Sequence, residues 1–172
     1  MISKRVKAKD LSNSTITAKV SILIAAHNEE LVIESKIKSI LSSNYPKESI
    51  EIFIGTDKCT DKTDEIIQRL SESNRSIKHV KFSERSGKIK IINSLTEDAN
   101  GDVLILTDAN VLFTENTINA LLKHFNDPKV GLVDSNMKNF GMNSSGISIP
   151  EKTYISVEGK LKYAEGKMWG SM

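Results

Sequence analysis

Four short polar segments carry the side chains that could take part in chemistry, and each follows an apolar run. They are residues 25–30 (AAHNEE), 56–61 (TDKCTD), 85–88 (RSGK) and 107–110 (TDAN). A ring can stack on a base, a carboxylate can accept a hydrogen bond from a base N–H, and a lysine with nearby backbone N–H groups can bind phosphate. Together the four segments therefore suit a nucleotide.

The aspartate of the last segment gives the sharpest indication. Asp108 directly follows the very apolar run VLILT, where a carboxylate is costly unless it meets water, a partner or a hard cation such as Mg²⁺ or Mn²⁺. The other candidates have simpler alternatives. His27 also suits a hydrogen-bonded turn residue, Gly87-Lys88 is a common loop pair, and an acid at a helix start can cap the helix. We assign capping to Asp61 and base recognition to Asp57.

Alternating strands and helices must position these segments. Short apolar runs rich in β-branched residues predict strands, and apolar residues three or four apart predict helices between them. The expected strands cover residues 20–25, 50–55, 78–82, 103–107 and 130–133, and the expected helices cover residues 33–41, 61–70, 88–98, 114–125 and 154–168. This order predicts an α/β domain with an open, mostly parallel, Rossmann-like sheet and helices on both faces. Because ligands bind at the carboxyl ends of such strands, the four polar segments should meet at one edge.

Composition limits the classes of protein that are possible. The chain has 172 residues, which suits one domain, and its net charge of +2 is too small for a dedicated nucleic-acid binder. A single cysteine excludes a disulfide framework, and no apolar run approaches the roughly 18 residues that cross a bilayer. We divide the chain into a flexible, basic and polar arm (residues 1–18) and one domain (residues 19–172).

Several segments in this order resemble family 2 glycosyltransferases with the GT-A fold, above all the membrane-associated polysaccharide synthases. The residues that carry the likeness are 20–30 (VSILIAAHNEE), 56–63 (TDKCTDKT), 87–88 (GK), 93–95 (NSL), 99–110 (ANGDVLILTDAN) and 130–133 (VGLV). Each motif is loose, but their order and spacing agree with the family. The likeness covers roughly residue 19 to the end of the chain.

The resemblance implies an inverting transferase that binds a nucleotide-sugar donor, taken as a UDP-sugar, with Mg²⁺ or Mn²⁺. Asp57 matches the carboxylate that reads the base, His27 the ring beside it, and Lys88 the lysine near the phosphates. Asp108 and Asn110 match the ends of the Asp-x-Asp motif, which holds the cation. The implied donor site consists of Ala25, Ala26, His27, Glu29, Asp57, Lys88, Asp108 and Asn110.

The sequence departs from the family pattern at three places. Lys58 stands where the motif Asp-Asp-Gly-Ser-Thr-Asp has its glycine, and Thr56 replaces its first acid. Asn110 brings a neutral oxygen instead of a carboxylate. The Glu-Asp motif of the general base is absent downstream of Asn110. Thr96-Glu97-Asp98 matches the residue types of that motif, but it lies upstream, at a helix end on the opposite edge of the expected sheet. We therefore expect the catalytic base beyond Met172, in a missing acceptor half, and expect this chain to be inactive alone.

The implied partners are the nucleotide-sugar donor and a glycan or lipid-linked acceptor, with no nucleic acid. The resemblance places the full-length enzyme at the cytoplasmic face of a membrane, attached through parts outside this chain. The alternative is a non-enzymatic signalling or nucleotide-binding module, such as a receiver domain. A receiver needs an aspartate after its third strand, whereas the third strand here ends in residues 82–84 (FSE) without one. A dinucleotide oxidoreductase is disfavoured because no Gly-x-Gly-x-x-Gly follows the first strand.

Overall fold

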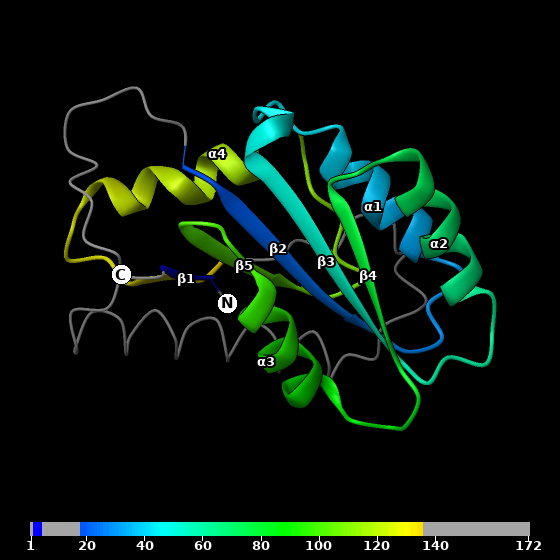
Figure 1. Ribbon diagram of the computed structural model, residues 1–172. Coiled ribbons are helices and arrows are strands. Elements are labelled where there is room, and N and C mark those ends of the chain that lie inside the picture. The colour runs from blue at the N-terminus through cyan, green and yellow to red at the C-terminus, as the bar shows by residue number, and fades with distance from the viewer. Residues whose placement is uncertain (1, 5–17, 136–172) are drawn as a thin grey trace, which may run out of the picture.

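The computed structural model describes residues 2–4 and 18–135, and a twisted sheet forms its centre (Figure 1). The sheet has six strands in the order β4-β3-β2-β5-β1-β6. Four of them are parallel: β2 (Val20–Ala26), β3 (Ile50–Asp57), β4 (Ile77–Phe82) and β5 (Val103–Thr107). Two short strands complete the sheet at one side, where β1 (Ile2–Lys4) runs antiparallel to β5 and to β6 (Leu132–Val133).

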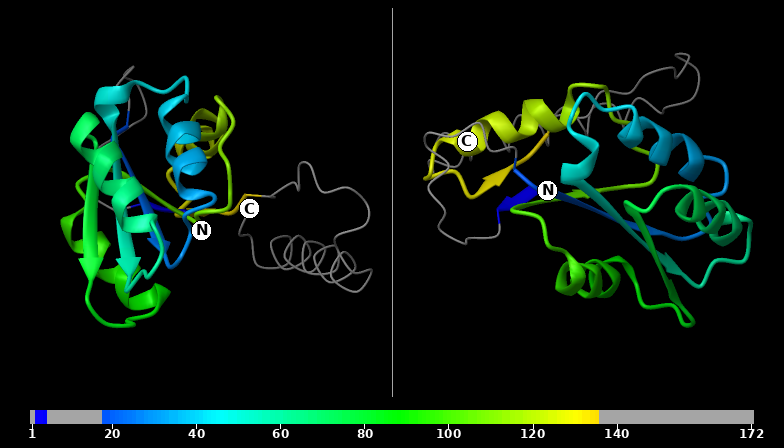
Figure 2. Two further views of the ribbon diagram at one scale, coloured as in Figure 1. Left: turned by 90° about the vertical axis from the view of Figure 1, so that its right-hand side faces the viewer. Right: turned by 45° about the horizontal axis from the view of Figure 1, so that its top comes forward.

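Helices cover both faces of this sheet (Figure 2). The helices are α1 (Ile33–Leu41), α2 (Thr63–Ser73), α3 (Lys88–Asp98) and α4 (Thr117–Leu122), with short 3₁₀ helices at Lys47–Ser49 and Lys123–Asn126. α1, α2 and α4 share one apolar core with the strands, and α3 packs on the opposite face against Leu23, Phe53 and Leu104. All eight residues of β3 are buried, as expected for a central strand covered on both faces, although its sequence includes Glu51, Thr56 and Asp57.

The predicted fold class is therefore confirmed, and three elements, α1, α3 and β5, have the predicted bounds. The helix predicted at residues 61–70 is also present, as α2. The connections from β2 to β3 and from β3 to β4 each carry one α-helix between neighbouring parallel strands, as expected because parallel strands need a crossover connection. The carboxyl ends of the four parallel strands consequently lie along one edge.

The structure corrects three details on the side where β1 and β6 lie. Residues 2–4, which we assigned to the flexible arm, form β1 because they pair with the otherwise open side of β5. The strand expected at residues 130–133 is shortened to β6 and pairs antiparallel with β1 rather than extending the parallel sheet. Thr114 does not cap α4: its backbone N–H donates to the Oγ of Thr117, the first residue of that helix.

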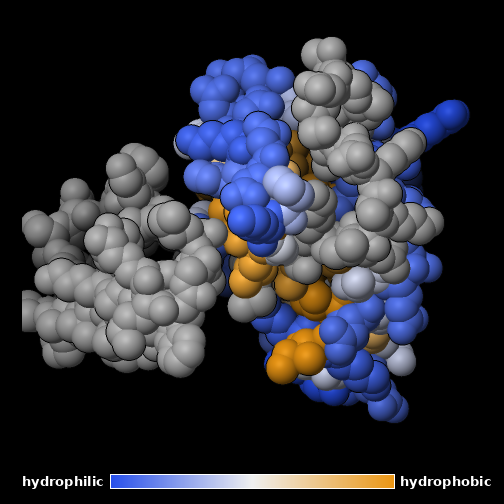
Figure 3. All heavy atoms as spheres, turned by 90° about the vertical axis from the view of Figure 1, so that its left-hand side faces the viewer, coloured by the Kyte–Doolittle hydropathy of each residue, from blue (hydrophilic) through white to orange (hydrophobic). Residues whose placement is uncertain are grey.

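Hydrophobic residues are visible at the surface on this side of the molecule (Figure 3). Leu132 of β6 is 45% exposed, whereas the apolar residues of β2 are buried or half-buried. In the part of the chain that the structure describes, every helix is too short or too polar to cross a bilayer. The helix predicted at residues 154–168 lies outside the described residues.

Candidate functional site

The four polar segments meet at the carboxyl edge of the parallel strands, where they line one cavity of about 330 Å³. The turn after β2 lies beside the turn after β3, since Ala26 pairs with Thr56 in the sheet. Every residue predicted for the donor site lines this cavity: Ala25, Ala26, His27, Glu29, Asp57, Lys88, Asp108 and Asn110. Arg85, Gly87, Ile91 and Ala109 complete the lining. The structure thus brings the predicted residues together, and their binding roles stay predictions.

Asp57 is a buried residue of the cavity lining, and it holds the neighbouring turn in place. Its Oδ1 accepts a hydrogen bond from the backbone N–H of Ser86 at 2.6 Å, and its Oδ2 accepts one from Gly87 at 3.1 Å. The Arg85 Nε is 3.5 Å from Oδ2. The hydrogen bond from Ser86 is the main cause that lowers the pKa of Asp57 below its usual value, so the side chain is a carboxylate at neutral pH. Each oxygen keeps a further lone pair with which it can accept from a ligand.

The His27 ring is fixed beside Asp57. Its Nδ1 lies 2.7 Å from the backbone carbonyl oxygen of Asp57. A carbonyl oxygen only accepts, so Nδ1 must carry the proton and Nε2 is left as an acceptor when the ring is neutral. The ring is half-buried and lines the cavity. It therefore combines both interpretations of the sequence: it is a hydrogen-bonded turn residue, and it also presents a surface to the cavity.

The turn after β2 and the turn after β3 are joined in both directions by bonds between a side chain of one and a backbone N–H of the other. The Asn28 Oδ1 accepts from the Thr60 N–H at 2.8 Å, and the Asp61 Oδ2 accepts from the Glu30 N–H at 3.1 Å. Asp61 also accepts from the N–H of Thr63, the first residue of α2, at 3.0 Å, although the residue at the cap position of this helix is Lys62. Lys58 has a φ of 52°. The lysine therefore adopts the left-handed conformation that glycine would adopt more easily at this position.

Lys88 and Asp108 form an ion pair across the cavity. Their side chains are 62% and 50% exposed. Lys88 is the first residue of α3, and Gly87 precedes it with a φ of 78°. Backbone N–H groups in the first turn of a helix favour anions. The cavity thus holds a basic group at a helix start directly opposite an acidic group.

Asp108 and Asn110 offer a cation one carboxylate and one amide oxygen. Both residues are exposed, whereas Ala109 between them is buried. Among the described residues, no group of three or more His, Cys, Asp or Glu side chains is placed to hold a metal ion. A hard cation prefers six or more oxygen ligands. These two residues therefore suit a cation that receives its remaining oxygens from a bound ligand, such as a diphosphate, and from water.

Lys36 is a residue of this region that the sequence analysis did not identify. It is 0% exposed, and its Nζ donates to the Thr107 Oγ1 at 2.9 Å and to the Val111 carbonyl oxygen. Burial lowers the pKa of Lys36 to about 7, and the negative charge of Asp108 acts in the opposite direction. A signal was present in the sequence. Position 36 falls three residues after Ile33 and four before Ile40, on the apolar face of the helix.

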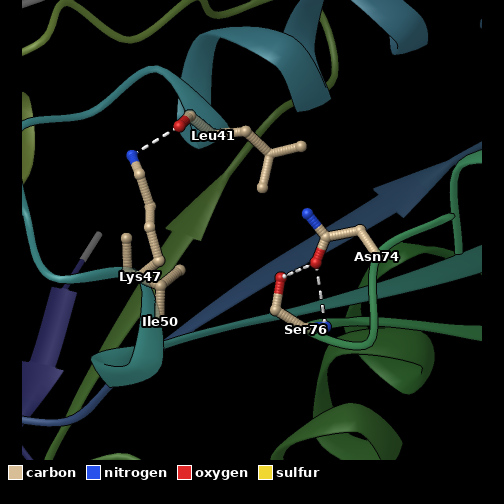
Figure 4. A pocket seen from close by; sticks show the side chains of 5 residues that line it. All are labelled: Leu41, Lys47, Ile50, Asn74 and Ser76. Atoms are coloured by element: carbon tan, nitrogen blue, oxygen red, sulfur yellow. Dashed lines mark hydrogen bonds between the residues drawn. The ribbon is translucent and has the colours of Figure 1, made fainter.

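A second cavity lies at the opposite edge of the sheet and does not share these features (Figure 4). It measures about 230 Å³ and is lined by Leu41, Lys47, Ile50, Asn74 and Ser76. The Lys47 ammonium donates to the Leu41 carbonyl oxygen, and Asn74 accepts from Ser76 (Figure 4). Among the residues that the structure describes, no acidic side chain lines this cavity. Its polar groups bond to one another, so we place the candidate site at the carboxyl edge.

Thr96-Glu97-Asp98 lies in the last turn of α3, far along the helix from the cavity that Lys88 lines at its first turn. The backbone that follows approaches the amino end of β3, where the Asn100 N–H donates to Glu51. This places the segment at the edge of the sheet opposite Asp108, as predicted.

With this geometry in place, comparison with known proteins identifies the family. A family model described as Glycosyl transferase family 2 matches residues 21–167. The chain belongs to this family. Family membership favours the transferase interpretation over the receiver-like alternative. The family match extends over most of the chain, whereas the receiver-like alternative depends on a single acidic turn.

Two bacterial proteins are similar to this chain in sequence. "Probable glycosyltransferase YdaM" of Bacillus subtilis is 37% identical over 119 residues, which are 67% of this chain and 28% of that protein. A poly-beta-1,6-N-acetyl-D-glucosamine synthase of Staphylococcus aureus is 29% identical over 147 residues, 85% of this chain and 35% of the synthase. This chain therefore spans about a third of the length of these relatives.

Solved structures with the GT-A fold share the architecture. A mannosyltransferase from Pyrobaculum calidifontis, in complex with GDP-Man and Mn²⁺, aligns with a TM-score of 0.64 and 28% identity, over 68% of this chain and 35% of that enzyme. S. aureus TarS in complex with UDP-GlcNAc aligns with a TM-score of 0.58 and 22% identity, over 63% of this chain and 31% of TarS. The TarS likeness bears on the fold alone.

Proposed function

We propose that this chain is the donor-binding part of an inverting glycosyltransferase. In this proposal it binds a nucleotide sugar, a UDP-sugar, together with Mg²⁺ or Mn²⁺, for transfer of the sugar to a polysaccharide or other glycan. The observation that carries the proposal is the convergence of all eight predicted residues on one cavity at the carboxyl edge of the sheet. Family membership and a relative complexed with GDP-Man and Mn²⁺ support it.

The base of the donor is assigned to the turns after β2 and β3. The His27 ring offers a surface on which a base can stack, and the backbone of Ala25 and Ala26 lines the same part of the cavity. The Asp57 carboxylate can accept from the uracil N3–H, whereas the N3 lone pair of cytosine would be repelled. Because backbone N–H groups keep this side chain charged, it remains an acceptor throughout the neutral range.

The diphosphate is assigned to the start of α3 and to the turn after β5. Lys88 and the backbone at the start of its helix suit phosphate oxygens, and Asp108 with Asn110 would hold the cation. A bound cation supplies charge neutralisation for the departing diphosphate. In the structure, Lys88 and Asp108 neutralise each other. Donor binding would accordingly replace one ion pair by contacts of Lys88 with phosphate and of Asp108 with the cation.

The general base is assigned to sequence beyond Met172 in a longer protein. Three acids line the cavity: Glu29, Asp57 and Asp108. In the proposal all three serve donor binding, which leaves none of them to deprotonate an acceptor hydroxyl. The chain's span of about a third of its relatives is consistent with an acceptor half elsewhere. A positioned base contributes roughly 10²- to 10⁴-fold in rate, so we expect donor binding but no transfer by this chain alone.

We place the full-length enzyme at the cytoplasmic face of a membrane, acting on a glycan or lipid-linked acceptor. The first residues of the chain include Lys4, Arg5, Lys7 and Lys9. A cluster of this kind suits an anionic leaflet. Binding of the chain to vesicles with and without anionic lipid, at low and at physiological salt, tests this placement.

Titration calorimetry of the 172-residue chain with UDP tests the donor proposal. Heat that saturates below millimolar UDP in the presence of Mn²⁺, and much less without it, is the expected result. No heat with millimolar UDP or GDP would contradict it. A turnover assay with UDP-sugars and a mixed acceptor panel tests the second part. UDP release coupled to a glycosylated product would place a general base within the chain.

A further inference from the structure

Lys36 lies in a place where lysine is rare. It belongs to the second turn of α1, and its neighbours on the same helix face, Ile33, Ile37 and Ile40, are 0% exposed, as it is itself. A fully buried lysine loses the hydration of its ammonium group and is found in proteins almost only where partners compensate. An apolar residue at position 36 would satisfy the packing of α1. The ammonium group must therefore have a role other than the packing of α1.

The partners of this ammonium all belong to one segment, residues 107–113, which contains the turn with Asp108 and Asn110. The Nζ donates to the Thr107 Oγ1 at 2.9 Å and to the Val111 carbonyl oxygen, and it lies 4.0 Å from the centroid of the Phe113 ring. One partner precedes the turn and two follow it. A compact group with three donors can satisfy all of them at once.

A second contact from the same helix reinforces this attachment. The Phe113 N–H donates to the Ser39 Oγ at 3.1 Å, and that hydroxyl donates to the Lys36 carbonyl oxygen at 2.7 Å. Ala109, in the middle of the turn, is 2% exposed and packs in the apolar core. The turn is thus attached to α1 on both sides and to the core through Ala109, while Asp108 and Asn110 on either side of Ala109 line the cavity.

We propose that Lys36 is a positioning residue that holds residues 107–113 against α1 and thereby fixes Asp108 and Asn110 at the cavity. The effect of Lys36 on cation and diphosphate binding rests on the proposed function of that cavity. The effect of Lys36 on the position of residues 107–113 does not rest on it. The side chain acts from behind the turn through Thr107 and Val111, and it lines neither the cavity nor its mouth.

The first measurement needs no ligand and compares amide hydrogen exchange in the wild type and in Lys36→Met. Methionine keeps an unbranched apolar side chain of similar length and removes the three donors. We expect exchange at Val111 and Phe113 to accelerate by about tenfold or more, the loss of one charged hydrogen bond, with Ile24 in β2 unchanged. Unchanged exchange at both amides would overturn the proposal. An equal acceleration at Ile24 would also overturn it, because it would mean a general role in stability.

Matched variants separate the local effect from loss of folding. Lys38→Met removes a lysine two positions further along α1 whose side chain is 65% exposed and pairs with Glu34, and we expect it to exchange like the wild type. Thr107→Val removes the Oγ1 acceptor while keeping the shape of the side chain, and should accelerate the same two amides. Should Lys36→Met fail to fold, unchanged exchange in Thr107→Val overturns the proposal.

The second measurement asks whether the segment positions the cation site. UDP is titrated into each folded variant with and without Mn²⁺. In Lys36→Met, or in Thr107→Val if the former does not fold, we expect the Mn²⁺-dependent gain in UDP affinity to fall by about tenfold, while the affinity without Mn²⁺ changes much less. A wild type with no Mn²⁺-dependent binding contradicts the proposed function, and the exchange data then decide the role of Lys36 alone. A Mn²⁺-dependent gain equal to that of the wild type would overturn the positioning of the cation site.

Discussion

Two aspartates that follow strands at the same cavity differ in what their surroundings allow them to do. Asp57 is 4% exposed and accepts from two backbone N–H groups, so its carboxylate is held in one orientation. The Asp108 side chain is 50% exposed and pairs with a flexible lysine. A fixed carboxylate suits recognition of a flat base edge, and an exposed one can rearrange around a cation. The assignment of base reading to Asp57 and cation binding to Asp108 follows from this difference.

The first prediction concerns the base. Replacing Asp57 by alanine should reduce the preference for UDP over CDP by about tenfold, the size of one hydrogen bond to a charged group. The ratio is the informative quantity, because the variant also releases the turn at Ser86 and Gly87 and weakens binding of both nucleotides. Titration of wild type and variant with UDP and CDP measures it. An unchanged ratio would mean that the base is read elsewhere.

GDP is a necessary third ligand in that experiment. The guanine N1–H can donate to the Asp57 carboxylate as the uracil N3–H does, so this side chain rejects cytosine more strongly than guanine. A wild type that prefers GDP to UDP would change the proposed donor to a GDP-sugar and leave the role of Asp57 intact.

The second prediction concerns the cation. Asp108→Asn should lower the Mn²⁺-dependent gain in UDP affinity by more than about tenfold, since only the carboxylate brings a full negative charge to a hard cation. Asp98→Asn is the matched control, because Asp98 is an exposed acid at the far end of α3. Calorimetry with and without Mn²⁺ measures both variants. Equal Mn²⁺ dependence in Asp108→Asn and the wild type would remove Asp108 from the site.

The candidate site could largely be predicted from the sequence, because an α/β sheet brings the ends of its parallel strands to one edge whatever the details of packing. What could not be predicted were partners that only the folded chain brings together. The ion pair of Lys88 with Asp108 and the bonds from Ser86 and Gly87 to Asp57 join residues 20 to 30 positions apart. The burial of Lys36 could not be predicted, because lysine is treated as a polar residue when a helix is recognised by its hydrophobic pattern.

Among the secondary-structure elements, α3 contributes most directly to the cavity because Lys88 stands at its start. The helix approaches β3 very closely. A Cβ placed on Gly55 would lie 2.3 Å from the Ile91 Cγ2 and 3.4 Å from the Leu95 Cδ1. Gly55 therefore sets the distance between the helix and the sheet.

The third prediction is that Gly55→Ala destabilises the domain by about 1 to 3 kcal/mol, the usual cost of overpacking a core. The helix must shift away from β3, and Lys88 at its start shifts with it, so UDP affinity without Mn²⁺ should fall as well. Urea denaturation and calorimetry measure the two effects. Gly131→Ala is the control, since no atom of the described part of the chain lies within 4 Å of its added Cβ. Stability equal to the wild type in both variants would refute the argument.

Element predictions succeeded where an element is long and buried and failed where it is short. β2 and β3 are buried on both faces, and their branched apolar runs reveal this directly. β1 has three residues and pairs with β5 and β6, and β6 has two residues and pairs with β1. A polar arm carries no periodic signal for such pairing. The fold class could therefore be predicted, but not the antiparallel strands at one side.

Across the whole molecule, the two edges of the sheet carry different charged clusters. The carboxyl edge holds the cavity with its exposed charges. At the amino edge, the Ser21 Oγ donates to the Glu51 Oε1 at 2.5 Å, and the Asn100 N–H donates to the same oxygen at 2.7 Å. Glu51 is 8% exposed. This cluster joins β2, β3 and the turn before β5, so its charge bears on stability without touching the candidate site.

The fourth prediction is a loss of stability in acid that depends on Glu51. Burial by itself would raise the pKa of Glu51, but hydrogen bonds from Ser21 and the Asn100 N–H outweigh it and lower the pKa below its ordinary value of about 4. A carboxylate with a lowered pKa in the folded state stabilises fully above the unfolded-state value, and this stability is lost as the pH falls through the folded-state value. Glu51→Gln should therefore lower the free energy of unfolding by about 1 to 2 kcal/mol at pH 7, and the stability of this variant should decline less than that of the wild type below about pH 4.

Urea denaturation from neutral to acid pH measures both quantities, and Glu115→Gln, which replaces an exposed acid, is the control. A variant whose stability declines in acid as steeply as that of the wild type would show that Glu51 is not responsible, and Asp57 and Asp61, whose pKa values are also lowered, would be the groups to replace next.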